Sequence, residues 1–104
     1  MNIIDIENQL REIIRKLPPY YSQNSAKELL DLFNSYKGIV EALPEDYRQI
    51  KYGVSTEFSA IKFDIEWAIK GTPKKEAESR FATAKANLKD DIDSIISELK
   101  QPTA

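Results

Sequence analysis

The chain has 104 residues and a net charge of −2, which fits one globular domain with balanced charge. It contains no cysteine and no histidine, which excludes disulfides, thiolate metal sites and Ser-His-Asp triads. Its three glycines lie far apart, so it has no glycine-rich phosphate loop. The balance of acidic and basic residues argues against a general DNA- or RNA-binding protein, because such proteins usually have an excess of basic residues. We find no apolar run long enough for a membrane span and no basic leader, and we expect a cytoplasmic protein without a cofactor.

Apolar residues recur every three or four positions almost throughout the chain, which predicts an all-α protein. The first helix is expected over residues 2–17, and Pro18 and Pro19 end it. Ser25 and Glu28 fit a capping box, so the second helix is expected to begin at Ser25 and run to about residue 43.

Pro44 separates the second helix from a third, which is expected to run to residue 70 with a possible bend at Gly53. Gly71 is a natural stop for that helix. We expect Thr72 to cap a fourth helix, with Pro73 as its first residue, that runs to residue 100. One domain then covers residues 1–100, and residues 101–104 form a frayed tail.

Short connections favour antiparallel neighbours, so we expect an antiparallel up-down four-helix bundle with a short first helix. The alternative is a long three-helix arrangement on which the first helix docks loosely. On the fourth helix the expected core positions are Ala77, Phe81, Ala84, Leu88, Ile92, Ile95 and Leu99.

The third helix has an unusual outer face. Its core stripe runs from Tyr47 to Ile69, and the opposite face carries aromatic residues where a bundle helix is normally polar. These residues are Tyr52, Phe63 and Trp67. Tryptophan and tyrosine are common in binding hot spots, which predicts a partner-binding or self-association surface. The competing explanation is that these rings are covered within the fold, either by a neighbouring helix or by the loop that contains Pro18–Tyr21.

Two charged segments offer weaker signals. Lys74 and Lys75 lie at the start of the fourth helix, where they could flank the aromatic surface or hold an anion; a solvated basic turn is the simpler interpretation. Asp90 and Asp93 can share a helical face, which is minimal geometry for Mg²⁺. The chain lacks a Glu-x-x-Glu motif, so these acids are more simply the polar side of the helix, and we expect no metal site.

The plan of four short-linked helices in about a hundred residues is similar to two families. One is the immunity proteins that protect bacteria from their own bacteriocins. The other is the small helical lipoproteins that assist photosystem II assembly. The resemblance to the second family lies in two segments that are similar to the start of that family's last helix, Thr72-Pro73-Lys74-Lys75 and Phe81-Ala82-Thr83-Ala84. The cysteine that carries the lipid in that family is missing from this chain.

The sequence therefore predicts a small non-enzymatic interaction protein of the immunity, assembly-factor or regulatory type. Its binding residues would be Tyr52, Phe63, Trp67, Lys74 and Lys75. Its partner would be another protein, with a self-assembling homodimer as the alternative. An enzyme of a different class, a Mg²⁺-dependent phosphohydrolase that uses the carboxylates of the fourth helix, is a third and more remote possibility.

Overall fold

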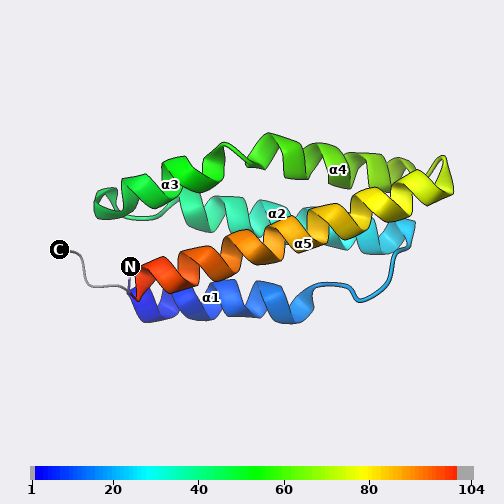
Figure 1. Cartoon of the computed structure of the whole chain (residues 1–104). Helices are drawn as coiled ribbons and strands as arrows, with labels where there is room; N and C mark the ends of the chain where they lie inside the picture. The colour runs from blue at the N-terminus through cyan, green and yellow to red at the C-terminus, as the bar shows by residue number, and fades with distance from the viewer. Residues whose placement is uncertain (1, 101–104) are drawn as a thin grey trace.

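The computed structural model describes residues 2–100, which form five α-helices and one short 3₁₀ helix with no strand (Figure 1). The elements are α1 (Ile3–Lys16), α2 (Gln23–Glu41), η1 (Glu45–Tyr47), α3 (Arg48–Ser55), α4 (Phe58–Lys70) and α5 (Lys74–Leu99). The all-α prediction is confirmed for this part of the chain. The expected frayed tail, residues 101–104, lies outside the described residues. None of the helices in residues 2–100 has the length and apolar character needed to cross a membrane.

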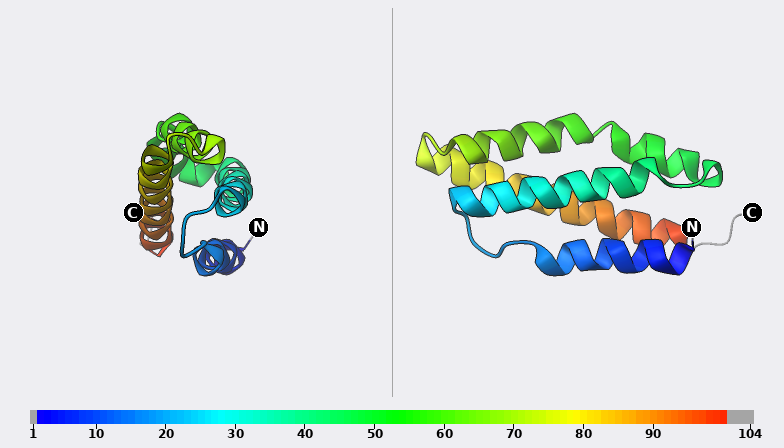
Figure 2. Two further views of the ribbon diagram at one scale, coloured as in Figure 1. Left: turned by 90° about the vertical axis from the view of Figure 1, so that its right-hand side faces the viewer. Right: turned by 180° about the vertical axis from the view of Figure 1, so that it is seen from behind.

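The helices run roughly along the long axis of the molecule, and α5 is the longest of them (Figures 1 and 2). α4 packs against α5 and α2, while α1 packs against α2 and α5. Ile6 and Leu10 of α1 are fully buried, so α1 is part of the core and is not loosely docked. α3 contributes no fully buried residue and covers only one end of α5.

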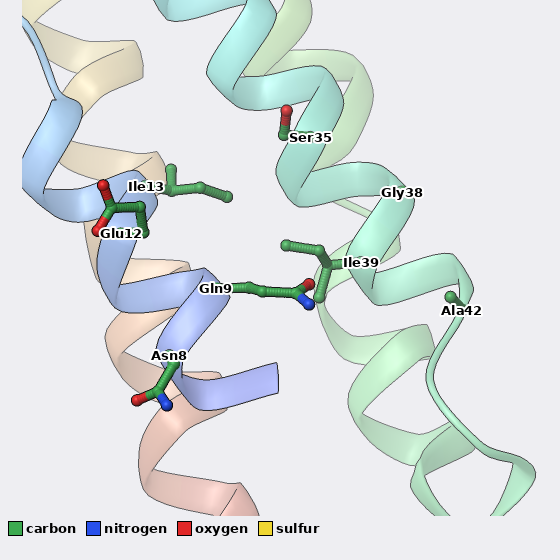
Figure 3. A pocket seen from close by; sticks show the side chains of 8 residues that line it. All are labelled: Asn8, Gln9, Glu12, Ile13, Ser35, Gly38, Ile39 and Ala42. Carbon is green, nitrogen blue, oxygen red and sulfur yellow. The ribbon is translucent and has the colours of Figure 1, made fainter. Parts of the chain in front are cut away.

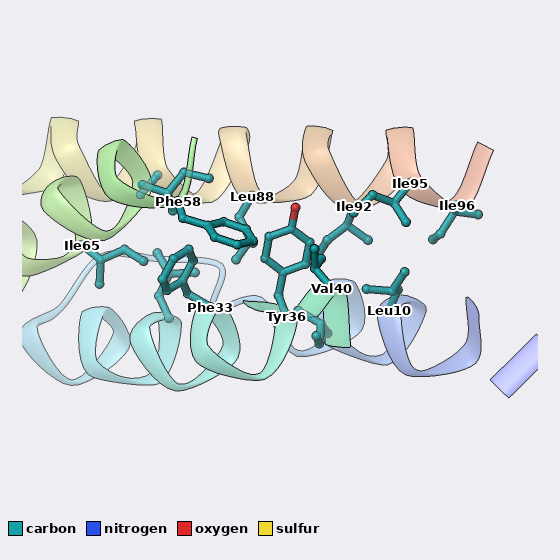
Figure 4. Close-up of a cluster of buried hydrophobic side chains, with 14 of the residues drawn as sticks. Leu10, Phe33, Tyr36, Val40, Phe58, Ile65, Leu88, Ile92, Ile95 and Ile96 are labelled. Carbon is teal, nitrogen blue, oxygen red and sulfur yellow. The ribbon is translucent and has the colours of Figure 1, made fainter. Parts of the chain in front are cut away.

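The centre of the core is aromatic. Phe33 and Tyr36 of α2 both pack edge-to-face against Phe58 of α4, with ring centroids 5.9 and 5.7 Å apart (Figure 4). Such pairs add to the hydrophobic stabilisation that the buried area already gives. All seven predicted core residues of α5 are buried, as its period of three and four residues indicated.

The start of α2 differs from the prediction. Ser22 is the N-cap, and its hydroxyl accepts a hydrogen bond of 2.9 Å from the Ser25 backbone N–H. The expected cap at Ser25 is therefore wrong, because the serine three positions earlier already satisfies that free N–H group. Gln23, the first helical residue, donates side-chain hydrogen bonds to the carbonyl oxygens of Ile69 and Lys70 at the end of α4.

The predicted third helix is divided into η1, α3 and α4, and the interruption falls at Thr56 and Glu57 instead of the expected bend at Gly53. The Ser55 hydroxyl donates to the Tyr52 carbonyl, and the Thr56 hydroxyl donates to the Gly53 carbonyl, at 3.2 and 3.1 Å. These side chains compete for carbonyls that the helical ladder would otherwise use, which favours a break. Gly53 itself lies inside α3.

The turn between α4 and α5 confirms one expectation and corrects another. Gly71 ends α4 in the left-handed region, with φ of 79°. Pro73 was expected as the first helical residue and Thr72 as the cap. Pro73 instead has extended ψ of 150° and is itself the N-cap residue, so α5 begins at Lys74.

We expect Gly71→Ala to destabilise the fold by about 1–3 kcal/mol, because the residue has positive φ. A Cβ atom there would also lie 2.5 Å from the Gln23 amide nitrogen. Gly38→Ala is the matched control, since Gly38 lies within α2 with no atom near its Cβ position. That change should stabilise the fold by about 0.5–1 kcal/mol. Urea unfolding of both variants gives the comparison, and equal effects would contradict it.

Candidate protein-interaction surface

Phe63 and Trp67 lie one turn apart on the outer side of α4, and their ring centroids are 6.1 Å apart. Phe63 is 53% exposed, and Trp67 is half-buried. The loop that was considered as a cover packs elsewhere. Tyr21 donates a hydrogen bond of 2.8 Å to the Ala68 carbonyl and packs its ring against Phe81, whereas Tyr20 is exposed. Phe63 therefore remains open to a partner.

Arg80 of α5 joins the two rings. Its guanidinium carbon lies 5.3 Å from the centroid of Phe63 and 5.3 Å from the centroid of Trp67. The Lys70 ammonium lies 5.2 Å from the Trp67 ring. Cations this close to aromatic faces are attracted by the electron-rich ring. We call this group, Phe63, Trp67, Lys70 and Arg80, the aromatic–arginine cluster.

Asp64 holds Arg80 in this position. Asp64 is only 8% exposed, and its carboxylate lies 2.8 Å from the Arg80 guanidinium. Glu76, one turn before Arg80 on α5, forms a second ion pair at 3.3 Å. The Asp64 hydrogen bond raises the pKa of Arg80, and Glu76 adds to this, so the guanidinium keeps its charge. Sequence reasoning missed both Asp64 and Arg80.

Tyr52 does not join this cluster. It lies on α3, beyond the break at Thr56 and Glu57, and lines a separate pocket with Val40 and Glu41 of α2. It is 72% exposed. The single aromatic face predicted for a continuous third helix is therefore divided, because the break changes the helical register between Tyr52 and the other two rings.

Lys74 and Lys75 are exposed in the first turn of α5, next to the end of α4. Within residues 2–100, no carboxylate lies within 4 Å of the ammonium groups of Lys70, Lys74 or Lys75. Lys70 in the aromatic–arginine cluster, and Lys74 and Lys75 next to it in the chain, thus have no ion-pair partner among residues 2–100.

The acidic residues of α5 do not gather into a metal centre. In the part of the chain that the structure describes, no group of three or more acidic side chains is placed to hold a metal ion. Asp93 pairs with Lys89 at 3.0 Å. Asp91 lies instead beside Glu57, and both line a pocket between α3 and α5.

Asp91 has an unusual environment. Burial, the hydrogen bond with Glu57 and the charges of Glu57 and Asp90 together raise the pKa of Asp91 to about 7, and burial contributes most. Burial, together with the charges of Asp91 and Glu57, also raises the pKa of Tyr36. One Asp91 carboxylate oxygen and the Tyr36 hydroxyl are buried without hydrogen-bond partners within residues 2–100.

A groove of about 740 Å³ lies between α1 and α2 (Figure 3). Gln9, Ile13 and Ile39 point into it, and Gly38 adds no side chain to the part of the wall that α2 forms. Among residues 2–100, Glu12 is the one ionisable residue that lines the groove, so no charged cluster forms there. Its chemistry does not select a ligand.

No protein-family model matches the chain, and no curated protein or solved structure matches it either. The two family resemblances drawn from the helix plan therefore remain resemblances.

We expect the Asp64–Arg80 pair to show a coupling energy above about 1 kcal/mol in a double-mutant cycle with alanine, because Asp64 is buried. The exposed Glu76–Arg80 pair is the matched control, and its coupling should be about 0.5 kcal/mol or less. Urea unfolding of the single and double variants measures both. Equal coupling energies would show that Asp64 is not the main partner of Arg80.

Asp91 should make stability depend on pH. Its pKa is higher in the folded chain than the ordinary value of 3.8, so folding loses stability as pH rises from about 4 to about 7. Asp91→Asn removes this loss and should raise the melting temperature at pH 8 more than at pH 4. Asp93→Asn, on the same helix but exposed and paired with Lys89, is the control variant. Parallel shifts of both variants at all pH values would contradict the assignment.

Proposed function

We propose that the chain is a non-enzymatic interaction module that binds another protein through the outer face of α4. The observation that carries this proposal is the aromatic–arginine cluster, in which Arg80 contacts two aromatic rings while Phe63 stays exposed. Tryptophan and arginine are the residues most enriched in binding hot spots. An immunity, assembly-factor or regulatory role fits this description, as does the expected cytoplasmic location.

The cluster is supported from within the fold, which favours binding. Arg80 is held by the buried carboxylate of Asp64, so its contacts with Phe63 and Trp67 exist before a partner arrives. A surface that is already ordered loses less conformational entropy on association. Phe63, Trp67 and Arg80 form this ordered surface, whereas Tyr52 belongs to a different part of the molecule's surface.

Charge indicates the kind of partner. Lys70 within the cluster, and Lys74 and Lys75 at the start of α5, have no carboxylate partners among residues 2–100. A partner that presents acidic groups around an apolar centre would complement this arrangement. We therefore propose a protein with an acidic surface, with Lys74 and Lys75 increasing the rate of association more than the final affinity.

We also propose that the helices form an antiparallel up-down four-helix bundle, in which α3 and α4 together make the third leg. The short connections support this, because they favour antiparallel neighbours. In this arrangement the third leg contributes its inner side to the core and leaves the face with Phe63 outside.

The test begins with the tagged chain and the protein that it captures from its own cell extract. Phe63→Ala should weaken binding of the purified partner by on the order of 30-fold, or about 2 kcal/mol, because a hot-spot ring is lost. The melting temperature should stay nearly unchanged, since the Phe63 ring is half exposed. Tyr20→Ala removes a ring that is 81% exposed in the loop between α1 and α2 and serves as the control.

Sedimentation equilibrium separates the two kinds of partner. A chain that stays monomeric at high concentration, with binding lost on Phe63→Ala, supports the proposal. A dimer that dissociates on Phe63→Ala would replace it with the homodimer alternative. Equal loss of partner binding in the Phe63 and Tyr20 variants would show that α4 is not the binding face.

A further inference from the structure

The two terminal nitrogen atoms of the Arg80 guanidinium meet carboxylates in very different surroundings. Nη1 donates a hydrogen bond of 2.8 Å to Asp64, whose side chain is 12% exposed. Nη2 lies 3.3 Å from a carboxylate oxygen of Glu76, whose side chain is 46% exposed. Asp64 is therefore an internal partner that holds the arginine in place, whereas the partner of Nη2 lies at the surface.

The contact between Arg80 and Glu76 is the weaker of the two. These residues lie four positions apart on α5, and exposed ion pairs of this kind contribute little to stability. A well-aligned hydrogen bond between a guanidinium and a carboxylate is also shorter than this contact, at about 2.7–2.9 Å. Glu76 can therefore leave Nη2 at a small cost in free energy, while Asp64 keeps the guanidinium in position.

An apolar ring lies beside the same guanidinium. The Phe63 ring centroid is 5.3 Å from the Arg80 guanidinium carbon, and Phe63 is 53% exposed. The planar fork of an arginine matches the geometry of a carboxylate, and an exposed phenyl ring offers apolar contact area. A group that uses both features must carry a carboxylate close to an apolar side chain or ring.

We propose that Glu76 occupies the position on Arg80 that an acidic side chain of the binding partner takes, while an apolar side chain of that partner packs on Phe63. Given the proposed role of the α4 surface in binding, on which this inference rests, Glu76 would pair with Arg80 in the free chain and release it when the partner arrives. Removing the charge of Glu76 should therefore strengthen binding. If Glu76 only supported the position of Arg80, the same change would weaken binding.

Hydrocinnamate tests this directly, because two methylene groups join its phenyl ring to a carboxylate. Titration of the full chain is followed by the NMR signal of the indole N–H of Trp67, the single tryptophan, whose ring lies 5.3 Å from the Arg80 guanidinium carbon. We expect a saturable shift at concentrations on the order of millimolar, as for other very small ligands. Hydrocinnamamide, which has the same shape without the charge, should bind at least about threefold more weakly, because charge-assisted hydrogen bonds are stronger.

Glu76→Gln removes the carboxylate and keeps the size of the side chain. This variant should bind hydrocinnamate about threefold more tightly than the unchanged chain, because Nη2 becomes available and a like charge is lost. Glu78→Gln is the matched control, since it changes the net charge equally at an exposed residue of α5 that has no ion pair within residues 2–100. Its affinity should equal that of the unchanged chain. Neither substitution should alter the binding of hydrocinnamamide.

Equal effects of the two substitutions, weaker binding of hydrocinnamate by Glu76→Gln, equal binding of the acid and its amide, or no saturable shift would overturn this inference. The proposed function fails separately, when Phe63→Ala leaves the binding of the captured partner unchanged. Loss of partner binding in Phe63→Ala, together with equal hydrocinnamate affinities of the Glu76 and Glu78 variants, would keep α4 as the binding face and reject the role of Glu76.

Discussion

The ion pair between Asp64 and Arg80 is the interaction on which the functional surface depends. It joins the middle of α4 to α5 over 2.8 Å, and Asp64 is almost fully buried. A buried carboxylate requires a partner, because its desolvation would otherwise be costly. Arg80 supplies that partner, because its guanidinium forms the ion pair with Asp64. The same guanidinium lies close to the rings of Phe63 and Trp67. The same side chain thus serves the core and the surface.

Two local features of the backbone, a helix break and a turn, determine which residues can contribute to the surface of α4. The Ser55 and Thr56 hydroxyls interrupt the helix before α4, so that Phe58 enters the aromatic core while Tyr52 is separated from Phe63. Gly71 then ends α4 with a left-handed residue, and the chain returns as α5, which packs against α4 at its start and reaches α1 at its far end (Figure 1). The interruption also leaves Glu57 next to Asp91. The surface of α4 and the acidic pocket both follow from this one break.

The periodic part of the structure was predictable, because burial repeats every three or four residues in a helix. Phe81 and Leu88 of α5 are buried as expected, and Gly71 ends a helix as expected. The cap at Ser22 was missed because Ser25 fits the same local pattern. The break at Thr56 was missed because side-chain competition for carbonyls does not alter the apolar period. Asp64 and Arg80 lie 16 residues apart, and local patterns carry no information about pairs at that separation.

The most direct test of this account uses Trp67, which is the single tryptophan of the chain. Acrylamide quenching of its emission should be compared between the unchanged chain and Arg80→Ala over a wide range of protein concentrations. The account predicts intermediate quenching that does not vary with concentration and rises in the variant, because Arg80 covers one face of the indole. Unchanged quenching in Arg80→Ala, or emission that shifts to the blue as the chain is concentrated, would contradict it.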